Sequence, residues 1–377
     1  MKSLPVILLA LLTCASLSAQ SYYESRRTWD KGPLAWNEFK GHVDNDTSIV
    51  ALRWNWIAEP VRVKVGTRQY WYMKFQPTMD MTESWVRGNF HNDQTLQFCQ
   101  TAFNLMELYC RQATADYAGS PESTGMHDIK RFYQRQYRHR LDQMEVETRR
   151  GQNPEQMALY AAGVETELEM THFDPTSIRF SKGKARMDLA AGYAAQVMLG
   201  DACTSMPAGI DVMMGIGWGR RHLATMNFSA VFPGKSKFDI ETRNGMIEKD
   251  DRVTGLQCLF GYGYQVGQDV ERPLYPWIGL GVQGISGPQL QAESDKRKSN
   301  DKNGFLMAAG MIYDIPFMRH YILKGCSTGT YYSHFNTLRV TSVRLMPKLQ
   351  LAHYSDLGWQ PSIHLSLTVN WGMVWSE

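Results

Sequence analysis

The sequence predicts two domains of different class: an α+β N-terminal domain, followed by an all-β, eight-stranded antiparallel transmembrane barrel. Residues 361–375 carry the first observation, because apolar and polar side chains alternate strictly along them. The apolar row is Ile363, Leu365, Leu367, Val369, Trp371, Met373 and Trp375, and the polar row is Ser362, His364, Ser366, Thr368 and Asn370. Period 2 indicates a strand with two different faces. An apolar face with terminal aromatics suits lipid, and a polar face suits a barrel interior.

An N-terminal export signal is the second observation. Residues 1–19 contain Lys2, an apolar run over residues 4–12 and small residues before Ala19, which is the pattern of a signal peptide. The apolar run is too short for a transmembrane helix. Cys14 leaves a lipoprotein signal as an alternative, although Thr13 fits poorly before such a cysteine. We therefore expect export of the mature chain.

Composition and cysteine usage exclude several classes of function. The formal net charge of +3 is nearly balanced and argues against a nucleic-acid partner. The cysteines outside the signal are odd in number and lack metal-type spacing: Cys99, Cys110, Cys203, Cys258 and Cys326. Cys99 and Cys110 would lie too far apart on one helix to bridge to each other. We expect buried or lipid-facing thiols, at most one disulfide, and no metal or other cofactor.

Residues 20–174 form the predicted periplasmic domain. Residues 32–90 carry short β-like runs, including Val61–Val65 and Gln69–Phe75. Apolar residues at three- and four-residue steps predict a helix over 95–113, and two more helices are predicted over 125–148 and 153–170. The basic cluster Lys130–Arg140 could indicate a nucleic-acid patch, but a solvated helix face fits a periplasmic address better.

Residues 175–377 form the predicted barrel. Alternating segments predict eight strands, at residues 187–199, 210–218, 224–232, 256–264, 278–283, 305–313, 343–351 and 361–375. We expect the last strand to close the barrel against the first. Pro347 disturbs the seventh strand because proline cannot donate to the ladder, and residues 316–336 stay unassigned. An eight-stranded barrel is just filled by its side chains, which argues against a diffusion pore.

The connections favour a barrel in the outer membrane. Short connections at 220–222 and 268–273 alternate with long polar ones at 234–251 and 287–303, as periplasmic turns and external loops do. A soluble secreted β-sandwich also predicts alternation and is the alternative. Strands of roughly nine residues and outward aromatics favour the barrel, although the fifth strand is short. The barrel resembles small outer-membrane barrels of Bacteroidetes.

A family resemblance covers about residues 30–170. Residues 34–41 are similar to the L-x-W-x-x-F-x-G opening of a family of secreted bacterial proteins regarded as zinc metalloproteases. In that family a Ser-Trp-Val segment, here Ser84–Val86, precedes a helix reading L-x-H-E-Q-G-H-F-D-x-x-E-x-Y-A-R. Residues 96–111 match that helix at Gln100, Phe103, Glu107, Tyr109 and Arg111. The family's later E-T-x-H-G segment resembles residues 147–151, with Gln156 and Tyr160 after it. The resemblance implies a zincin-like fold.

The catalytic groups of that family are missing at the matching positions. Two histidines one helical turn apart would hold zinc, and the glutamate between them would activate its water. Phe98 and Ala102 replace the histidines, Cys99 replaces the glutamate, and Arg150 replaces a third histidine. None of these side chains can do that chemistry. The resemblance therefore implies a degenerate, non-catalytic protease domain with no metal. His91 and His127 lie nearby but lack the one-turn spacing.

His364 and Ser366 offer the competing hypothesis, a membrane-embedded hydrolase. A histidine beside a serine can act as base and nucleophile if a carboxylate orients the histidine. Some outer-membrane lipid A deacylases look similar, with H-x-S on a strand, but their flanking motif is absent here. We expect these two side chains to fill the lumen instead.

The sequence thus predicts a non-catalytic protein of the outer membrane, not an enzyme. Its barrel would sit in outer-membrane lipid and anchor a protease-like binding or scaffold domain in the periplasm. The expected partner of that domain is a periplasmic protein, a peptide or a glycan. The sequence does not identify this ligand or the oligomeric state.

Overall fold

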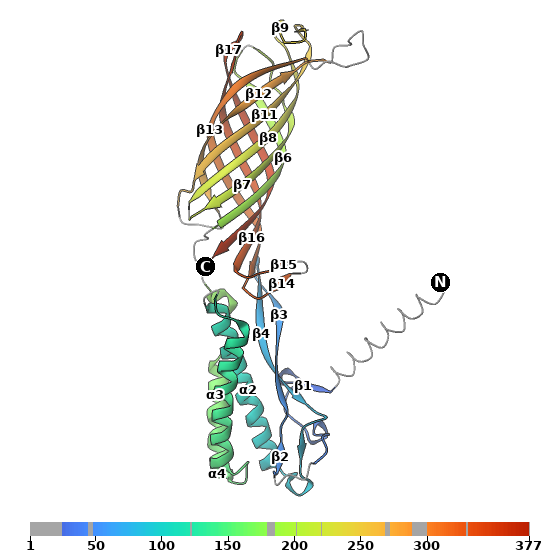
Figure 1. Ribbon diagram of the computed structural model, residues 1–377, viewed down its shortest axis with the longest axis vertical. Coiled ribbons are helices and arrows are strands. Elements are labelled where there is room, and N and C mark those ends of the chain that lie inside the picture. The colour runs from blue at the N-terminus through green and yellow to red at the C-terminus, as the bar shows by residue number, and fades with distance from the viewer. Residues whose placement is uncertain are drawn as a thin grey trace, which may run out of the picture. The chain divides into compact units, whose positions relative to one another are not determined.

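The computed structural model describes residues 25–43, 48–120, 123–178, 185–200, 202–219, 221–267, 272–288, 300–328 and 331–376. The predicted signal peptide lies outside these residues. The chain divides into two units, each described here by itself (Figure 1). The N-terminal unit takes in the described residues up to Val61, Tyr72–Ile178 and Lys324–Tyr332. The barrel unit takes in Arg62–Trp71, the described residues from 185 to Leu323, and those from Ser333 onward.

This division differs from the predicted boundary at residue 174 in two segments. Residues Arg62–Trp71 group with the barrel because the β4 residues Arg68–Trp71 pair in parallel with Arg319–Ile322. Residues Lys324–Tyr332 group with the N-terminal unit. The Lys324 ammonium donates there to the carbonyl oxygen of Ser120 at 2.9 Å and lies over the ring of Tyr117. A single domain boundary in the sequence cannot describe either of these two segments, because each groups with the unit on the other side of that boundary.

The N-terminal unit combines short strands with three long helices. Its described elements are β1 (Arg26–Thr28), η1 (Trp29–Lys31), η2 (Trp36–Glu38), β2 (Val50–Ala51), β5 (Trp85–Val86), η3 (Gly88–Phe90), α2 (Asp93–Gly119), α3 (Met126–Thr148), α4 (Pro154–Met170), η4 (Pro175–Ser177), β14 (Ser327–Thr328) and β15 (Tyr331–Tyr332). The long strands β3 (Trp54–Val65) and β4 (Arg68–Asp80) pass through both units. All three predicted helices are present. No helix in the described parts of the chain is long and apolar enough to cross a membrane.

Helix capping explains where two of the helices begin. The Asn92 side chain accepts a hydrogen bond from the Thr95 amide and caps α2. The Asn153 side chain accepts from Gln156 and caps α4, where Pro154 occupies the first turn. Behind these caps, α2 packs on both α3 and α4. The core of the unit therefore centres on α2.

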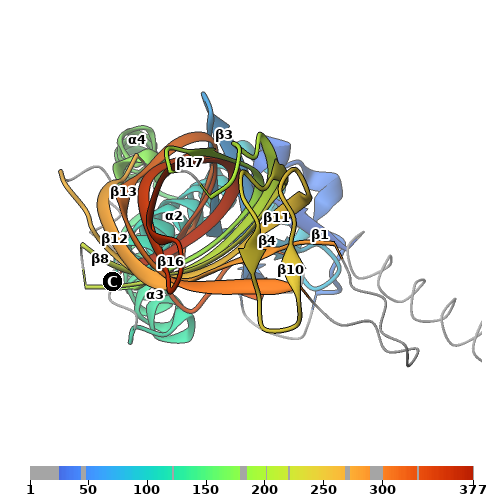
Figure 2. The same ribbon diagram turned by 90° about the horizontal axis from the view of Figure 1, so that it is seen from above.

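The barrel unit is a closed antiparallel ring. Its strands are β6 (Ala185–Met198), β7 (Ala208–Trp218), β8 (His222–Lys235), β11 (Arg252–Tyr264), β12 (Leu274–Ser286), β13 (Asp301–Ile322), β16 (Asn336–Tyr354) and β17 (Gly358–Ser376). Each pairs with the next, and β17 pairs with β6. The sheet has eleven strands, of which β1, β3 and β4 lie outside the ring, so the ring has eight. The predicted eight-stranded barrel is confirmed, and the β-sandwich alternative is wrong (Figure 2).

The outer surface of the ring is an apolar belt. Outward side chains include Ile216, Phe260, Ile278, Leu280, Val282, Leu349, Leu365 and Leu367, all 45–66% exposed. Aromatic residues flank this belt: Trp218, Tyr262, Tyr264 and Trp371 lie toward one end, and Phe232, Phe305 and Trp359 toward the other. The predicted outward and inward rows are thus confirmed.

Two strand expectations need correction. The short fifth strand, predicted at residues 278–283, runs from Leu274 to Ser286 as β12. Pro347 does not break the seventh strand, because β16 continues through it and stays paired with β17. Pairing with β13 resumes on both sides of the proline, at Gly310–Lys348 and Tyr313–Leu345. Pro347, which lacks a backbone N–H, therefore faces β13 at the point where the hydrogen-bonded pairing with that strand is interrupted.

The connections between strands define two ends of the barrel. The end with the β7–β8 and β11–β12 turns is here named the turn end, and the end with the β8–β11 and β12–β13 connections is the loop end. The predicted alternation has two exceptions. The β16–β17 connection at the loop end is only Ser355–Leu357, and the β13–β16 connection at the turn end is a long segment, Leu323–Phe335.

Side chains fill the barrel interior. Apolar residues from the described loops, Ala202, Cys203, Met206, Ile240 and Ile247, join the interior cluster at the loop end. Trp277 is 2% exposed and donates its indole N–H to the Thr225 hydroxyl at 2.8 Å. A Cβ at Gly261 or Gly279 would lie 2.1 or 2.4 Å from this indole, so only glycine leaves it room.

Candidate functional site

The residues aligned with the metal-binding motif of the resembling family, here named the former metal positions, are fully buried in an apolar core. Phe98, Cys99 and Ala102 on α2 are each 0% exposed. They pack with Phe103 of the same helix and with residues from other parts of the unit, including Leu34, Val50, Met79, Val86, Met144 and Met157. This core leaves no open position at which a metal could meet water.

The structure brings the two halves of the resemblance together. A Cβ on Gly151 would lie 3.1 Å from the Phe98 Cβ, so the segment after α3 packs directly on α2. The Thr148 hydroxyl accepts from the Gly151 amide at 3.3 Å and donates to the Met144 carbonyl, and so fixes this turn. Arg150, at the third ligand position, pairs with Glu145 at 3.2 Å. Phe98 and the segment at Arg150–Gly151, which align with parts of the family's metal site, are therefore neighbours. Neither Phe98 nor Arg150 offers a group that binds a metal.

The other candidate groups near this core are also engaged. Burial raises the pKa of the Cys99 thiol to about 12, so it stays protonated and a poor nucleophile. The His91 ring stacks on Trp36, and its Nε2 lies 3.1 Å from the Val86 carbonyl oxygen. No cluster of three metal-ligating side chains occurs in the described residues. All five cysteines outside the signal are free, and Cys258 alone among them is partly exposed.

A separate cavity of about 260 Å³ lies within the N-terminal unit, along α2 beyond the former metal positions. It is lined by Trp29, Asp30, Tyr72, Lys74, Phe75, Gln76, Pro77, Glu107, Arg111, Thr114, His172 and Phe173, and we name it the α2 pocket. Consecutive side chains of a strand point to opposite faces, yet four consecutive β4 residues line the pocket. The pocket therefore meets β4 at its edge.

That edge of β4 is only partly paired. Strand β1 covers it over Thr78–Asp80, and the Phe75 amide instead donates to the Thr114 hydroxyl of α2 at 3.0 Å. Thr114 thus joins the helix to the strand at the pocket wall. The resulting surface combines an open strand edge with aromatic and charged side chains, which is a common composition for ligand pockets.

Glu107 is a buried carboxyl group in the α2 pocket with a shifted pKa. Burial raises the pKa of its carboxyl group, and the positive charges of Arg111 and Lys74 oppose that rise. The Arg111 Nε donates to Glu107 Oε1 at 2.8 Å, and Arg111 Nη1 donates to the carbonyls of Leu168 and Thr171. In the described residues Glu107 Oε2 has no hydrogen-bond partner, which leaves an acceptor for a bound group.

The pocket is balanced in charge and partly aromatic. Lys74 makes no hydrogen bond or ion pair with any described residue, and Asp30 lies at the exposed rim. Trp29 is held between its hydrogen bond to Asn104 and the guanidinium of Arg111, 5.1 Å from the ring. This arrangement can hold a neutral or zwitterionic ligand that has donors, acceptors and a flat apolar face.

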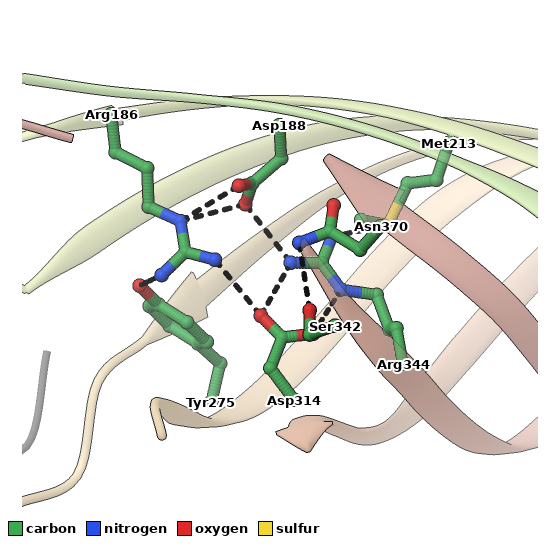
Figure 3. A network of polar contacts seen from close by, with 8 residues as sticks. All are labelled: Arg186, Asp188, Met213, Tyr275, Asp314, Ser342, Arg344 and Asn370. Atoms are coloured by element: carbon green, nitrogen blue, oxygen red, sulfur yellow. Dashed lines mark hydrogen bonds and ion pairs between the residues drawn. The ribbon is translucent and has the colours of Figure 1, made fainter. Parts of the chain in front are cut away.

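The barrel interior holds a second cluster of charged groups, in which four side chains form a closed ring of ion pairs (Figure 3). Arg186 pairs with Asp188 at 2.8 Å and with Asp314 at 2.9 Å. Arg344 pairs with the same two aspartates, at 3.0 and 2.6 Å. Two positive and two negative charges balance, and Tyr275 adds a hydrogen bond to Arg186 at 3.3 Å.

Further interior contacts continue toward the loop end. Lys348 donates to Asn227 Oδ1 at 2.9 Å, and Asn227 donates to Asp211 at 2.9 Å. Four more side chains form a cluster of amides and one hydroxyl: Gln196, Gln257, Gln350 and Ser362. These groups mostly satisfy each other, which is expected of structural polar networks. Together with the apolar interior cluster, they occupy the lumen.

His364 and Ser366 both face this lumen and are almost fully buried, at 0% and 1% exposure. His364 Nε2 lies 3.3 Å from the Ser229 hydroxyl rather than from Ser366. Neither His364 Nδ1 nor Ser366 Oγ has a hydrogen-bond partner among the described residues. The structure thus places the two residues on one face, but within the part of the chain that it describes no carboxylate orients His364 through Nδ1.

Sequence reasoning identified Glu107 and Arg111 only as scaffold positions of the resemblance. A polar residue on the buried side of α2, followed by arginine one turn later, is the signal that could have drawn attention to the pair. The interior ion pairs had a clearer signal, because Asp188 and Arg344 fall in the inward rows of their strands.

Comparisons with known proteins give limited additional information. No protein-family model matches the chain, and no curated protein matches it in sequence. Among solved structures, the chain is similar to Ail, the attachment invasion locus protein of Yersinia pestis, with 11% identity and a TM-score of 0.27 over 50% of this chain and 99% of that one. Neisserial surface protein A gives 9% identity and a TM-score of 0.28 over 51% and 96%. The N-terminal β-barrel domain of Pseudomonas aeruginosa OprF gives 10% and 0.23 over 50% and 98%. The identities and TM-scores of these comparisons are low, and the barrel assignment is based on the closed strand pairing described above.

Proposed function

We propose that this protein is a non-catalytic outer-membrane protein whose barrel anchors a ligand-binding domain in the periplasm. The observation that carries the proposal is the contrast between the barrel's two surfaces. Its outside is a continuous apolar belt between aromatic residues, which suits lipid. Its inside is filled by apolar side chains and balanced ion pairs, which suits an anchor rather than a channel.

The N-terminal unit supplies the binding role in this proposal. Its former metal positions are occupied by a packed core, so hydrolysis has no chemical support there. The α2 pocket is a concave surface of this unit, with the buried acceptor of Glu107 and the cation of Lys74 facing it. A peptide, an envelope protein or a glycan of the periplasm offers matching donors, acceptors and apolar surfaces.

The anchor can be tested on the full chain in its host membrane. We expect the protein to fractionate with outer membranes and to migrate differently on gels before and after heating, as folded barrels do. Extraction into buffer without detergent would contradict the anchor. Purified full-length protein should contain no stoichiometric zinc, and a tightly bound zinc ion would contradict the non-catalytic assignment.

Site-specific crosslinking can test the binding role. A photoreactive amino acid at Gln76, on the pocket wall, should give a discrete adduct in growing cells. The matched control carries the same group at Glu155, an exposed residue in the first turn of α4 that lies outside the pocket lining. Equal adducts at both positions, or none at Gln76, would contradict a ligand in the α2 pocket.

A further inference from the structure

The turn end of the barrel unit carries a cluster of basic side chains. Three long strands, β13, β16 and β17, stay paired beyond the aromatic residues of the belt. The β3–β4 hairpin tip joins them through the parallel pairing of β4 with β13. A small apolar core of Tyr70, Tyr321, Leu338, Val340 and Val374 holds this extension together. Five basic residues lie on it: Arg62, Lys64 and Arg68 are exposed, Arg339 is half-buried and Arg319 is buried. We name the three exposed residues, Arg62, Lys64 and Arg68, the basic collar.

The segments that form this extension are rich in basic residues. Residues 62–71, 316–323, 333–342 and 370–376 contain no aspartate or glutamate. The strand register sets Arg68 opposite Arg319 and His320 opposite Arg339. The charges of Arg62 and Arg339 both act on His320. Positive charge is therefore concentrated in this part of the barrel unit.

The collar begins where the apolar belt ends. On β13 the outward residues Tyr313, Ile315 and Phe317 are 38–54% exposed, and the strand pairs with Arg68 of β4 directly beyond them, at Arg319. Arg62, Lys64 and Arg68 are all exposed. The guanidinium of Arg62 lies 5.5 Å from the ring centre of Trp71, and that of Arg68 lies 5.9 Å from Tyr321. Aromatic rings thus support two of these cations at the border of the belt.

The loop end of the same barrel is different. Basic residues there alternate with acidic ones, as in Glu248, Lys249, Asp250, Asp251 and Arg252, and Lys302 pairs with Asp356. If the whole barrel surface attracted anions, basic residues would be in excess at both ends. Residues 62–71, by contrast, contain three basic residues and no acidic one, which points to an anionic surface beside the collar.

We propose that the basic collar binds the phosphate headgroups of anionic lipids in the leaflet at the turn end of the barrel. This inference rests on the proposed membrane anchor and adds a lipid-binding site to it. Guanidinium groups match phosphate oxygens in geometry and charge, and each basic residue near an anionic surface contributes to its attraction. The bilayer that holds the barrel places such headgroups at the level where the belt ends.

Native mass spectrometry of the full chain in detergent can test the site, with phosphatidylglycerol as the anionic probe and phosphatidylcholine as the zwitterionic one. We expect the protein to retain phosphatidylglycerol preferentially. The variant with Arg62→Gln, Lys64→Gln and Arg68→Gln should bind it roughly 100-fold more weakly, because three exposed charges are lost. Raising the salt concentration should weaken binding to the unchanged protein as well.

The matched control removes three charges at the loop end, with Lys235→Gln, Lys249→Gln and Arg252→Gln. It should bind phosphatidylglycerol within about 3-fold of the unchanged protein, since these residues lie outside the collar. Equal binding of the two lipids, or an equal loss of phosphatidylglycerol binding in both variants, would contradict headgroup binding by the collar. Heat-modifiable migration, measured on the same samples, reports the barrel separately. Its loss in the unchanged protein would overturn the anchor itself.

Discussion

The two units of this protein fill their interiors in opposite ways. In the N-terminal unit, the helix positions that would hold a metal in the resembling family carry Phe98, Cys99 and Ala102, and the core around them is apolar. In the barrel, by contrast, Arg186, Asp188, Asp314 and Arg344 are buried in the lumen and pair with one another. The location of a polar side chain therefore has a different meaning in each unit.

The difference follows from the surroundings of each unit. A barrel with an apolar outside has its polar side chains on the inner face of the sheet, where ion pairs keep them satisfied. A helical domain in water places its polar residues outside. A buried polar group there, such as Glu107, is then the exception that marks a candidate site. Buried charge is structural in the barrel and at Arg27, which pairs with Glu38, whereas Glu107 lines the pocket for which we propose a binding role.

The largest expected effect tests the structural role of the lumen charges. Replacing Arg344 with methionine should lower the free energy of unfolding of the barrel by about 3–5 kcal/mol, because two buried aspartates lose one of their two cations. Urea unfolding of the full chain in detergent, followed by gel migration, measures this loss. The double variant Arg344→Met and Asp314→Leu leaves the balanced pair of Arg186 and Asp188 and should recover at least half of it. An equal loss in both variants would show that charge balance does not stabilise the lumen.

Much of the barrel could be predicted from the sequence, because strand period and lipid exposure act on every residue of a strand. The alternation along residues 361–375 gave both the face and the closing partner of β17. The extra length of β13 and β16 could not be predicted this way. Their ends pair with β4, a strand more than two hundred residues away, and local patterns carry no information on such contacts.

The candidate site was less predictable than the barrel. The family resemblance directed attention to Phe98 and Ala102, which replace the metal ligands of that family, and away from Glu107 and Arg111, 5 to 13 residues further along α2. A pocket depends on how α2, β4 and the segment at residues 172–173 pack together. No periodicity in one segment reports such packing.

A second prediction tests whether the N-terminal core still tolerates metal ligands. Restoring the family residues with Phe98→His and Ala102→His should lower the free energy of unfolding of this unit by about 2–3 kcal/mol, because imidazoles enter a packed apolar core. Zinc should not bind stoichiometrically, since Arg150 occupies the third position. Thermal unfolding and metal content of the purified protein measure both outcomes. The control Phe98→Leu should cost less, and tight zinc binding by the double variant would contradict a closed core.

A third prediction concerns the lumen serines on β17. Ser366 Oγ has no hydrogen-bond partner among the described residues, so Ser366→Ala should change the free energy of unfolding by less than about 1 kcal/mol. Ser362, four residues earlier on the same face of β17, accepts a hydrogen bond from Gln196 at 2.8 Å. Ser362→Ala should therefore lower the free energy of unfolding by more than Ser366→Ala does. Urea unfolding in detergent compares them. Lipid composition of cells carrying His364→Ala should stay unchanged, and an altered lipid profile would revive the hydrolase hypothesis.

The smallest effects concern two glutamates of the N-terminal unit whose pKa values shift in opposite directions. Burial raises the pKa of Glu107, so the folded protein binds this proton more tightly than the unfolded chain. Its contribution to stability is present below the ordinary glutamate pKa and is lost as pH rises through the raised value. The hydrogen bond from Arg140 lowers the pKa of Glu167. That contribution is present above the ordinary pKa and is lost as pH falls through the lowered value.

Thermal unfolding of the N-terminal unit across mildly acidic pH can separate the two glutamates. In Glu107→Gln, the unfolding temperature should fall less as pH rises above the ordinary glutamate pKa. In Glu167→Gln, the unfolding temperature should fall less as pH drops below that pKa. Because the Glu167 side chain is 44% exposed, its effect should stay under about 1 kcal/mol. If both variants changed the same side of the profile, Glu107 would be an ordinary paired carboxylate. The α2 pocket would then lose the buried acceptor that distinguishes it from the rest of the unit.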